Sequence, residues 1–312
     1  MKKITIFFGL VMGFATAVAT TIPVQYFKQR SLINTSALSE VQNLQVFLSG
    51  AYSLVGFEGA PRTFVLDAAS PISFDNRRNR NMRGFRQAEP TRSFLCGTFE
   101  YESFGVHRHF RMVLGYAYRL MVGDNASVTF GVGGGISTIS SNFDQIINGT
   151  ETPIHSVRET SFAYRIGVRF DVDRLSVSAF NNDRDLMAEI VWGRLWDNDR
   201  TTRNNRNNQS GGFGFGDERT RNWRGQVAVL FIHSTDINHA SIRFSANATN
   251  GGFGIGIRYQ TGNDLSANVS LRITQALRIG YAYQLMALNP MARKHEIVIR
   301  YRLIRSDDDR GF

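Results

Sequence analysis

Strict alternation of apolar and polar residues marks a long stretch near the end of the chain. Residues 265–273, 277–285 and 297–303 each place an apolar side chain at nearly every second position, with Ser, Asn, Arg, Gly or Gln between. Because successive side chains of a β-strand point to opposite faces, this period of two predicts strands with one apolar and one polar face. The short breaks between the three segments predict tight turns and therefore an antiparallel meander.

The same period recurs upstream. Further strands are predicted at residues 41–52, 63–72, 92–103, 110–121, 126–139, 162–170, 175–180, 189–196, 223–232, 240–248 and 253–259. The polar faces carry arginine and glycine rather than a second apolar layer, which is typical of a barrel with lipid outside and water inside. We therefore predict an all-β fold, a transmembrane antiparallel β-barrel of about 14 strands, or 12 if the weakly patterned segment 189–196 and a neighbour are not strands.

The arginines of the polar faces identify the lumen. A charged side chain that faces lipid at the bilayer centre costs about 2–4 kcal/mol, so these residues are expected to point inward. The set comprises Arg111, Arg119, Arg165, Arg169, Arg258, Arg272, Arg278 and Arg300, together with Arg243 and Arg302. Two interpretations stay open: an anion-selective pore, or a plugged interior in which arginines pair with Glu100, Asp171, Glu189 and Glu296.

The N-terminus predicts export. Lys2 and Lys3 precede an apolar run and the small residues at 17–19, which is the order of a secretory signal peptide cleaved near Ala19. We expect a signal peptide at 1–19, a periplasmic lead-in without periodicity at 20–40, the barrel at 41–304 and a polar tail at 305–312. The expected location is the outer membrane of a Gram-negative bacterium, in contact with its lipid.

Charge and composition narrow the function. Hydrophobic residues make up 42% of the 312, and no apolar run beyond the N-terminus is long enough for a membrane-spanning helix. The net charge of +10 becomes +8 (10 − 2) without the two signal-peptide lysines, which suits anionic lipid or an acidic partner. Export makes nucleic acid the least suitable partner. Cys96 is the single cysteine, so neither an intrachain disulfide nor a thiolate metal cluster is expected.

Two segments, 75–92 and 197–224, are rich in arginine and lack periodicity, which predicts long loops. By strand parity both leave the barrel on the periplasmic side, where turns are normally short. We interpret them as candidate partner-binding loops. Their arginines are Arg77, Arg78, Arg80, Arg83 and Arg86 in the first, and Arg200, Arg203, Arg206, Arg219 and Arg221 in the second.

Catalytic motifs are absent from the sequence. The glycine-rich runs at 131–135 and 211–216 lack the Lys-Ser/Thr of a phosphate-binding loop, and inward glycines of close-packed strands explain them more simply. The six histidines accompany no Gly-x-Ser-x-Gly nucleophile motif, so we interpret them as rim or surface residues. We expect no cofactor, no metal and no enzymatic activity; an outer-membrane hydrolase remains a third class of function.

Motifs at both ends of the predicted barrel resemble those of the PorP/SprF family of outer-membrane proteins. Near the end of the chain these are the Gly-Tyr-Ala-Tyr segment at 280–283 and a final strand that contains His295, Glu296, Ile297, Tyr301 and Arg302. The first predicted hairpin carries the run Val55, Gly56, Phe57, Glu58, Gly59, Ala60, Pro61, Arg62 and Thr63.

The resemblance implies a component of the type IX secretion and gliding apparatus. Such a barrel is expected to support secretion or surface attachment of cargo bearing a type IX C-terminal signal. The resemblance also implies contact with periplasmic, peptidoglycan-linked secretion components. The alternation by itself indicates only a barrel.

Overall fold

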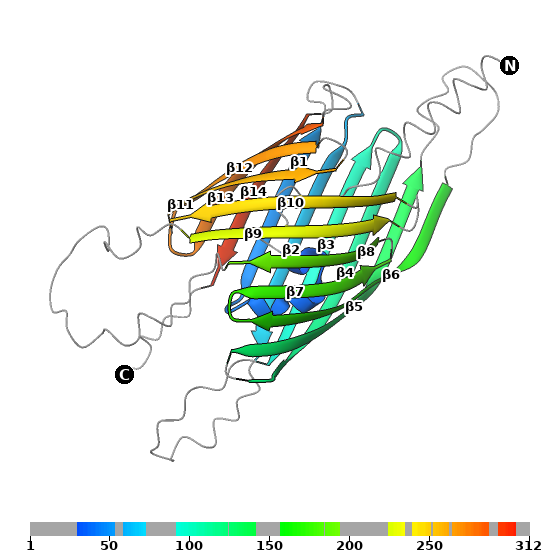
Figure 1. Ribbon diagram of the computed structural model, residues 1–312. Helices are drawn as coiled ribbons and strands as arrows, with labels where there is room; N and C mark the ends of the chain where they lie inside the picture. The colour runs from blue at the N-terminus through cyan, green and yellow to red at the C-terminus, as the bar shows by residue number, and fades with distance from the viewer. Residues whose placement is uncertain are drawn as a thin grey trace, which may run out of the picture.

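Fourteen antiparallel strands close into one barrel in the computed structural model (Figure 1). The structure describes residues 30–53, 59–72, 92–123, 125–141, 157–183, 185–193, 224–234, 239–250, 252–261, 264–286 and 293–303. The strands are β1 (Gln45–Ser53), β2 (Arg62–Ile72), β3 (Ser93–Phe104), β4 (His107–Met121), β5 (Ala126–Ser141), β6 (Val157–Val172), β7 (Leu175–Asn182), β8 (Asp185–Trp192), β9 (Arg224–Ser234), β10 (His239–Thr249), β11 (Phe253–Gln260), β12 (Asp264–Arg272), β13 (Leu277–Met286) and β14 (Lys294–Arg302).

Each strand pairs with its neighbours in sequence, and β1 pairs with β14 from Gln45↔Arg302 to Ser53↔Lys294 to close the cylinder. Closure leaves no sheet edge, which is the condition for strands to cross a bilayer. The predicted barrel and its count of 14 strands are confirmed. Among the described residues, no helix is both long and apolar enough to cross a membrane.

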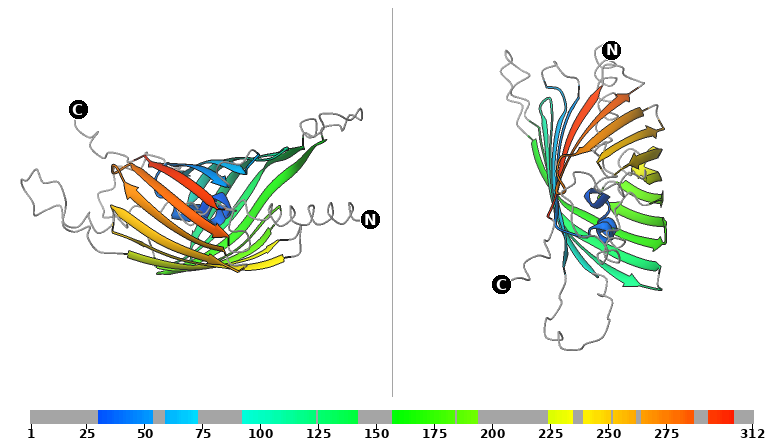
Figure 2. Two further views of the ribbon diagram at one scale, coloured as in Figure 1. Left: turned by 90° about the horizontal axis from the view of Figure 1, so that it is seen from above. Right: turned by 90° about the vertical axis from the view of Figure 1, so that its left-hand side faces the viewer.

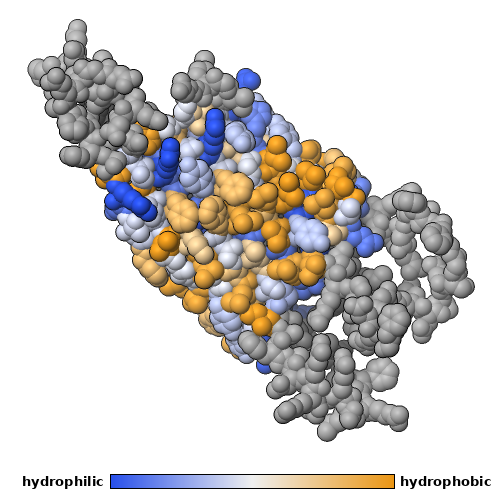
Figure 3. Space-filling model, turned by 180° about the vertical axis from the view of Figure 1, so that it is seen from behind, coloured by the Kyte–Doolittle hydropathy of each residue, from blue (hydrophilic) through white to orange (hydrophobic). Residues whose placement is uncertain are grey.

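The two faces of the wall differ as the alternation predicts. Outward side chains are large and apolar, and many are well exposed, such as Leu114 (61%), Ile166 (57%) and Ile257 (62%). Figure 3 shows such apolar residues spread over the middle of one side of the wall, with polar residues toward its ends. Inward positions are mostly Ser, Thr, Asn, Gln and Arg, and they are buried inside the barrel.

Strand β8 begins and ends earlier than the pattern predicts, at 185–192 rather than 189–196. Its outward residues are apolar, but so is the inward Met187, which packs on residues in the middle of the lumen. Because Met187 and Val191 make the inward face partly apolar, the alternation is blurred. Gly193, with a φ of +90°, ends the strand.

Two short 3-10 helices, η2 (Arg30–Leu32) and η3 (Thr35–Glu40), lie inside the barrel before β1. Figure 2 shows them, in blue, between the walls of the cylinder. Every residue from 30 to 39 is buried. Residues 20–40 were expected to form a periplasmic lead-in, but residues 30–40 lie inside the barrel. We call residues 30–40 the plug.

Candidate functional site

The plug lies against inward glycines on three neighbouring strands. A Cβ atom at Gly131 of β5 would lie 2.3 Å from the Ser36 backbone nitrogen, and one at Gly115 of β4 would lie 2.9 Å from Thr35 Cγ2. At Gly167 of β6, a Cβ atom would lie 2.8 Å from Asn34 Oδ1. Only residues without a side chain permit this approach, so these glycines form a seat for the plug.

Apolar contacts join the plug to both sides of the lumen. Leu32 and Ile33 belong to a buried cluster with residues of six strands, namely Phe47, Val65, Phe180, Met187, Leu230, Ile232 and Val298. Leu38 joins a second buried cluster that contains Phe94 and Ala117. These contacts remove apolar surface from water across the width of the barrel, which stabilises a filled lumen.

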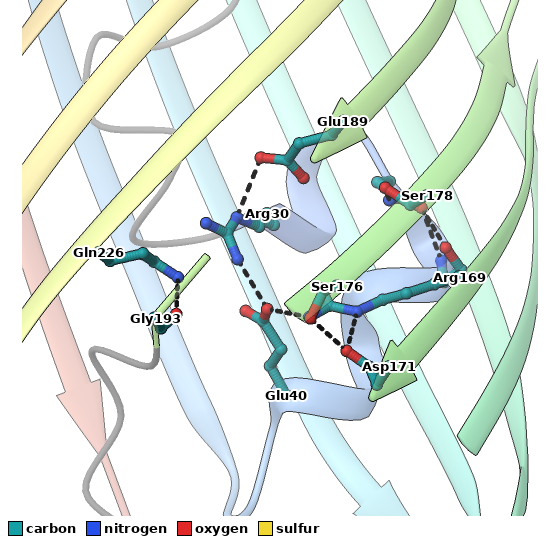
Figure 4. Close-up of polar contacts among 11 residues, drawn as sticks. Arg30, Glu40, Arg169, Asp171, Ser176, Ser178, Glu189, Gly193 and Gln226 are labelled. Atoms are coloured by element: carbon teal, nitrogen blue, oxygen red, sulfur yellow. Dashed lines mark hydrogen bonds and ion pairs between the residues drawn. The ribbon is translucent and has the colours of Figure 1, made fainter. Parts of the chain in front are cut away.

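An ion cluster fixes the end of the plug that leads into β1 (Figure 4). Glu40 Oε1 lies 2.8 Å from Arg30 Nη1 and 2.6 Å from Arg169 Nη2 of β6. Arg30 also lies 3.2 Å from Glu189 of β8, and Arg169 donates to Asp171 at 2.8 Å. Three carboxylates thus surround two guanidinium groups whose side chains are 1% and 4% exposed.

The charge state of Glu40 follows from these contacts. Burial alone would raise the pKa of its carboxyl, but the adjacent Arg169 and Arg30 guanidinium groups together hold that pKa below its ordinary value of 4.5. A carboxylate that accepts charge-assisted hydrogen bonds is stabilised in its ionised form. Glu40 is therefore an ionised cross-link between the plug and the wall.

A second polar network lies deeper in the lumen. Asp67 of β2 accepts hydrogen bonds from Ser31 of the plug (3.1 Å) and Thr98 (2.7 Å). Arg165 donates to Thr98 at 3.1 Å and to Glu100 at 3.4 Å. Arg111 pairs with Asp183 and lies 3.9 Å from Glu100. Of the carboxylates expected to pair with lumen arginines, Glu100 and Asp171 do so, while Glu189 pairs with a plug residue, Arg30.

The remaining lumen arginines fall into three sets. Arg243 donates to Gln260 and Arg258 to Gln284, and both arginines are buried. Arg119 lies over the Phe94 ring at 5.1 Å. The others lie side by side on β12, β13 and β14; we call them the arginine row, which consists of Arg272, Arg278, Arg300 and Arg302.

The two Arg-rich loops lie almost wholly outside the described residues, and their ten candidate arginines are among the residues not described. Their flanking strands are described. The first loop connects β2 to β3, and the second connects β8 to β9. Both connections lie at the end of the barrel where β1 starts and β14 ends. We call this the terminal end. With 14 strands the parity expected for both loops holds, so neither loop reflects a miscounted strand.

The family motif of the first hairpin lies at the opposite end. Val55 to Glu58 are outside the described residues, but Gly59 has a φ of +73° and its carbonyl accepts a hydrogen bond of 2.8 Å from Gly105 N–H in the β3–β4 turn. A pocket of about 240 Å³ between the two hairpins is lined by Gly59, Ala60, Arg62, Tyr101, Ser103, Gly105 and Arg108. The motif thus fixes one hairpin against the next.

The final-strand motif contributes to the closing strand pair and to the outer wall. Ile297 and Tyr301 are exposed on the outside, whereas Glu296 is fully buried inside. His295 Nδ1 and the Tyr281 hydroxyl share a hydrogen bond of 2.7 Å, and the His295 ring packs near Tyr283. An aromatic group of this kind is typical of the membrane boundary of a barrel.

Two histidines at the start of β4 each contact a serine of β5. His109 Nε2 lies 2.9 Å from Ser137 Oγ, and His107 Nδ1 lies 2.7 Å from Ser141 Oγ. Ser137 is only 1% exposed, whereas the His107–Ser141 contact is exposed.

The plug is the part of the site that the sequence analysis missed. One signal could have indicated it: inward apolar residues such as Phe47 and Leu230, unusual for a water-filled lumen, require an apolar partner inside. The three seat glycines, on adjacent strands, are a second such signal.

The chain is distantly similar to several solved structures. The outer membrane protein Omp33 of Acinetobacter baumannii has a TM-score of 0.49 at 9% identity, over 84% of this chain and 98% of that one. The toluene transporter TbuX of Ralstonia pickettii has a TM-score of 0.49 at 11% identity, over 87% and 92%. No curated protein sequence matches significantly. The family model described as "Type IX secretion system membrane protein PorP/SprF" matches residues 17–301, and the chain therefore belongs to that family.

Proposed function

We propose that this outer-membrane barrel is a non-enzymatic docking component of type IX secretion. In this role the terminal end binds an acidic surface of a periplasmic, peptidoglycan-linked component, and the barrel anchors the assembly in the membrane. The barrel thereby supports secretion or surface attachment of cargo that carries a type IX C-terminal signal. Family membership supports the secretion role, and the docking mode is our proposal.

The observation that carries the docking mode is the concentration of positive charge at one end. The Arg-rich loops at 75–92 and 197–224 both connect strands at the terminal end, and the arginine row lies at the same end. Long connections are unusual on the side of a barrel where the chain begins and ends. A basic surface of this kind attracts acidic partners over distances of about 10 Å at 0.1 M salt.

The contacts of the plug support docking over conduction. The anion-selective pore, our alternative, requires a water-filled path along the inward arginines. Buried apolar residues from opposite walls instead meet Leu32 and Ile33, and Arg30, Arg165 and Arg169 are held in ion pairs. Planar-bilayer recordings of the purified barrel separate the two: docking predicts a closed barrel, whereas steady anion current would favour the pore.

Charge reversal tests the docking mode in cells. Loop variants carry glutamate at the five arginines of either loop, in a strain whose own copy of the gene is deleted. We expect fewer proteins with type IX C-terminal signals in the medium and on the surface, and loss of co-purification with a periplasmic component. The physical reason is that repulsion replaces attraction between loop and partner.

A matched control makes the same arginine-to-glutamate change at the opposite end of the barrel. Arg62→Glu with Arg108→Glu reverses charge at the opposite end, in the pocket between the first two hairpins. This variant should retain the periplasmic partner. If both loop variants secrete and co-purify like the parent protein, the docking proposal is wrong.

A further inference from the structure

A line of alternating arginine and serine residues crosses the outside of five neighbouring strands. Each member is directly opposite the next in the strand pairing, and the members are Arg62 of β2, Ser103 of β3, Arg108 of β4, Ser140 of β5 and Arg158 of β6. Each lies an even number of positions from an exposed apolar residue of its own strand, such as Phe64, Met112 or Phe162. The line therefore belongs to the outer face of the wall, at the end opposite the terminal end. We call these five residues the basic edge.

The basic edge follows the end of the lipid-facing surface. The next outward positions toward the middle of the wall include the aromatic residues Phe64, Tyr101 and Phe110. The row after that is apolar throughout and consists of Leu66, Phe99, Met112, Ile136 and Phe162. In Figure 3 hydrophilic side chains likewise protrude at one end of the apolar surface. Because aromatic rings mark the boundary between the apolar band of a barrel and the headgroups, the basic edge lies at headgroup level.

Two arginines of the basic edge share a preformed pocket. Arg62, Ser103 and Arg108 line the space of about 240 Å³ between the first two hairpins. The turns of these hairpins are joined, because Gly105 N–H donates to the Gly59 carbonyl at 2.8 Å. A Cβ atom added at Gly59 would lie 3.2 Å from Gly105 Cα. Contacts between backbones therefore fix the wall of the pocket beside the two guanidinium groups.

The positive charge of the basic edge is not compensated within the wall. In the part of the chain that the structure describes, its three arginines are exposed and make no hydrogen bond or ion pair through their side chains. The basic edge and the two outward rows beside it contain no acidic residue. The lumen arginines Arg165 and Arg169, by contrast, are paired with carboxylates. The basic edge is thus complementary to an anion from outside the chain.

The spacing of the basic edge suits a ligand with two phosphate groups. Arg62 and Arg108 lie two strand spacings apart, about 10 Å, with Ser103 between them. Arg108 and Arg158 flank Ser140 in the same way. A guanidinium group binds phosphate oxygens through paired hydrogen bonds, and a serine hydroxyl can donate another. The edge therefore offers two similar phosphate positions that share Arg108.

We propose that the basic edge binds a membrane lipid whose headgroup carries two phosphates. One phosphate lies over Ser103 and the other over Ser140, and the acyl chains lie against the apolar outer wall. Free phosphate has the same charge but buries no apolar surface, so the adjoining wall favours the lipid. This site goes beyond the docking function. The proposed orientation of the barrel places it in the outer leaflet, but the site itself does not rest on that orientation.

Native mass spectrometry of the purified barrel in detergent micelles tests the site. The probe is lipid A, a glycolipid with two phosphates. We expect Arg62→Gln with Arg108→Gln to lower the affinity for lipid A about tenfold or more, since each arginine at a membrane surface adds to the attraction of an anionic lipid. Arg108→Gln alone should weaken binding more than Arg158→Gln alone, because both phosphate positions share Arg108.

Matched variants separate phosphate recognition from net charge. Arg174→Gln with Arg293→Gln removes the same charge from two exposed positions outside the basic edge and should leave the affinity unchanged. Arg62→Lys with Arg108→Lys keeps the charge without the planar fork and should give an intermediate affinity. Lipid A with a single phosphate should bind several-fold more weakly. Heat-dependent electrophoretic mobility shows whether each variant retains a folded barrel.

Three results would overturn the proposal. The first is an unchanged affinity in the folded Arg62→Gln, Arg108→Gln variant. The second is an equal loss in the Arg174→Gln, Arg293→Gln control, which would mean that net charge alone attracts the lipid. The third is displacement of lipid A by an excess of inorganic phosphate, which would show a site for the free anion. Charge reversal of the loops at the terminal end should leave lipid A bound, so failure of the docking proposal is a separate result.

Discussion

The lumen has two arginine-rich regions that differ in burial and in the residues next to each guanidinium group. Around the plug, Arg30 and Arg169 lie among Glu40, Asp171 and Glu189, and their side chains are almost inaccessible to water. On β12 to β14, the arginine row presents four arginines in adjacent positions and stays partly exposed. The same residue type is therefore surrounded by carboxylates in one region and lies opposite like charges in the other.

The comparison shows that inward arginines of one barrel can have different effects on its stability. A buried guanidinium group needs carboxylates at hydrogen-bond distance, because an uncompensated buried charge is very costly. A guanidinium group at a mouth is partly hydrated, so its charge costs less there than in the interior. Neutralising one arginine in each region should thus change stability in opposite directions.

The largest effect is expected for Arg169→Gln. Loss of this cation leaves Glu40 and Asp171 buried with less compensation, and breaking a buried ion pair in this way costs about 3–5 kcal/mol. The free energy of unfolding in urea, measured in lipid vesicles, checks this value. Arg169→Lys keeps the charge and should lose less; equal losses for both would mean that shape rather than charge holds the plug.

Gly131→Ala attacks the same region through its packing. The new Cβ atom would meet the Ser36 backbone at 2.3 Å, which a flexible side chain cannot relieve. Such overpacking costs about 1–3 kcal/mol. Gly50→Ala is the matched control, because nothing lies within 4 Å of its added Cβ. Similar unfolding free energies for the two variants would contradict a tightly seated plug.

Acid should loosen the plug through Glu40. Its pKa is lower in the folded protein than its ordinary 4.5, so its contribution to stability is complete above about that pH and is lost as the pH falls through the folded value. We expect this loss to be smaller than that of Arg169→Gln, because Asp171 still faces Arg169. Unfolding measured from pH 6 to pH 3 checks the trend, and Glu40→Gln should flatten that part of the profile.

The smallest effect has the opposite sign. Arg278→Gln removes the middle charge of the arginine row and should stabilise the barrel by about 0.2–1 kcal/mol. A clear loss of stability would show that the row, like Arg169, is held by fixed partners.

The sequence predicts the strands of the barrel wall far better than the plug inside the barrel. Strands β12 to β14 alternate cleanly because lipid requires apolar side chains on one face and the lumen tolerates polar ones on the other. β6 begins five residues earlier than predicted. The alternation does not indicate residues 157–161 as part of the strand, because they are exposed and lack an apolar face. The alternation has no information about a segment that no membrane contacts.

The plug illustrates that limit. Residues 30–40 show neither a period of two nor a helical period, and 3-10 helices this short are stable only through tertiary contacts. Its partners lie far along the chain: Asn34 bonds to Ser178, and Arg30 pairs with Glu189. The family motif, by contrast, was readable, but its role at the turn depends on Gly105, 46 residues beyond Gly59.

Placing the plug before β1 has a consequence for assembly. The first residues of the described chain contact β3 to β6 and β8, yet the barrel closes only when β14, the last strand, pairs with β1. Strands β3 to β6 can therefore contact the plug while the sheet is still open, and the pairing of β14 with β1 then encloses it. In a barrel that closed without these contacts, the plug could reach its seat only through an end of the cylinder.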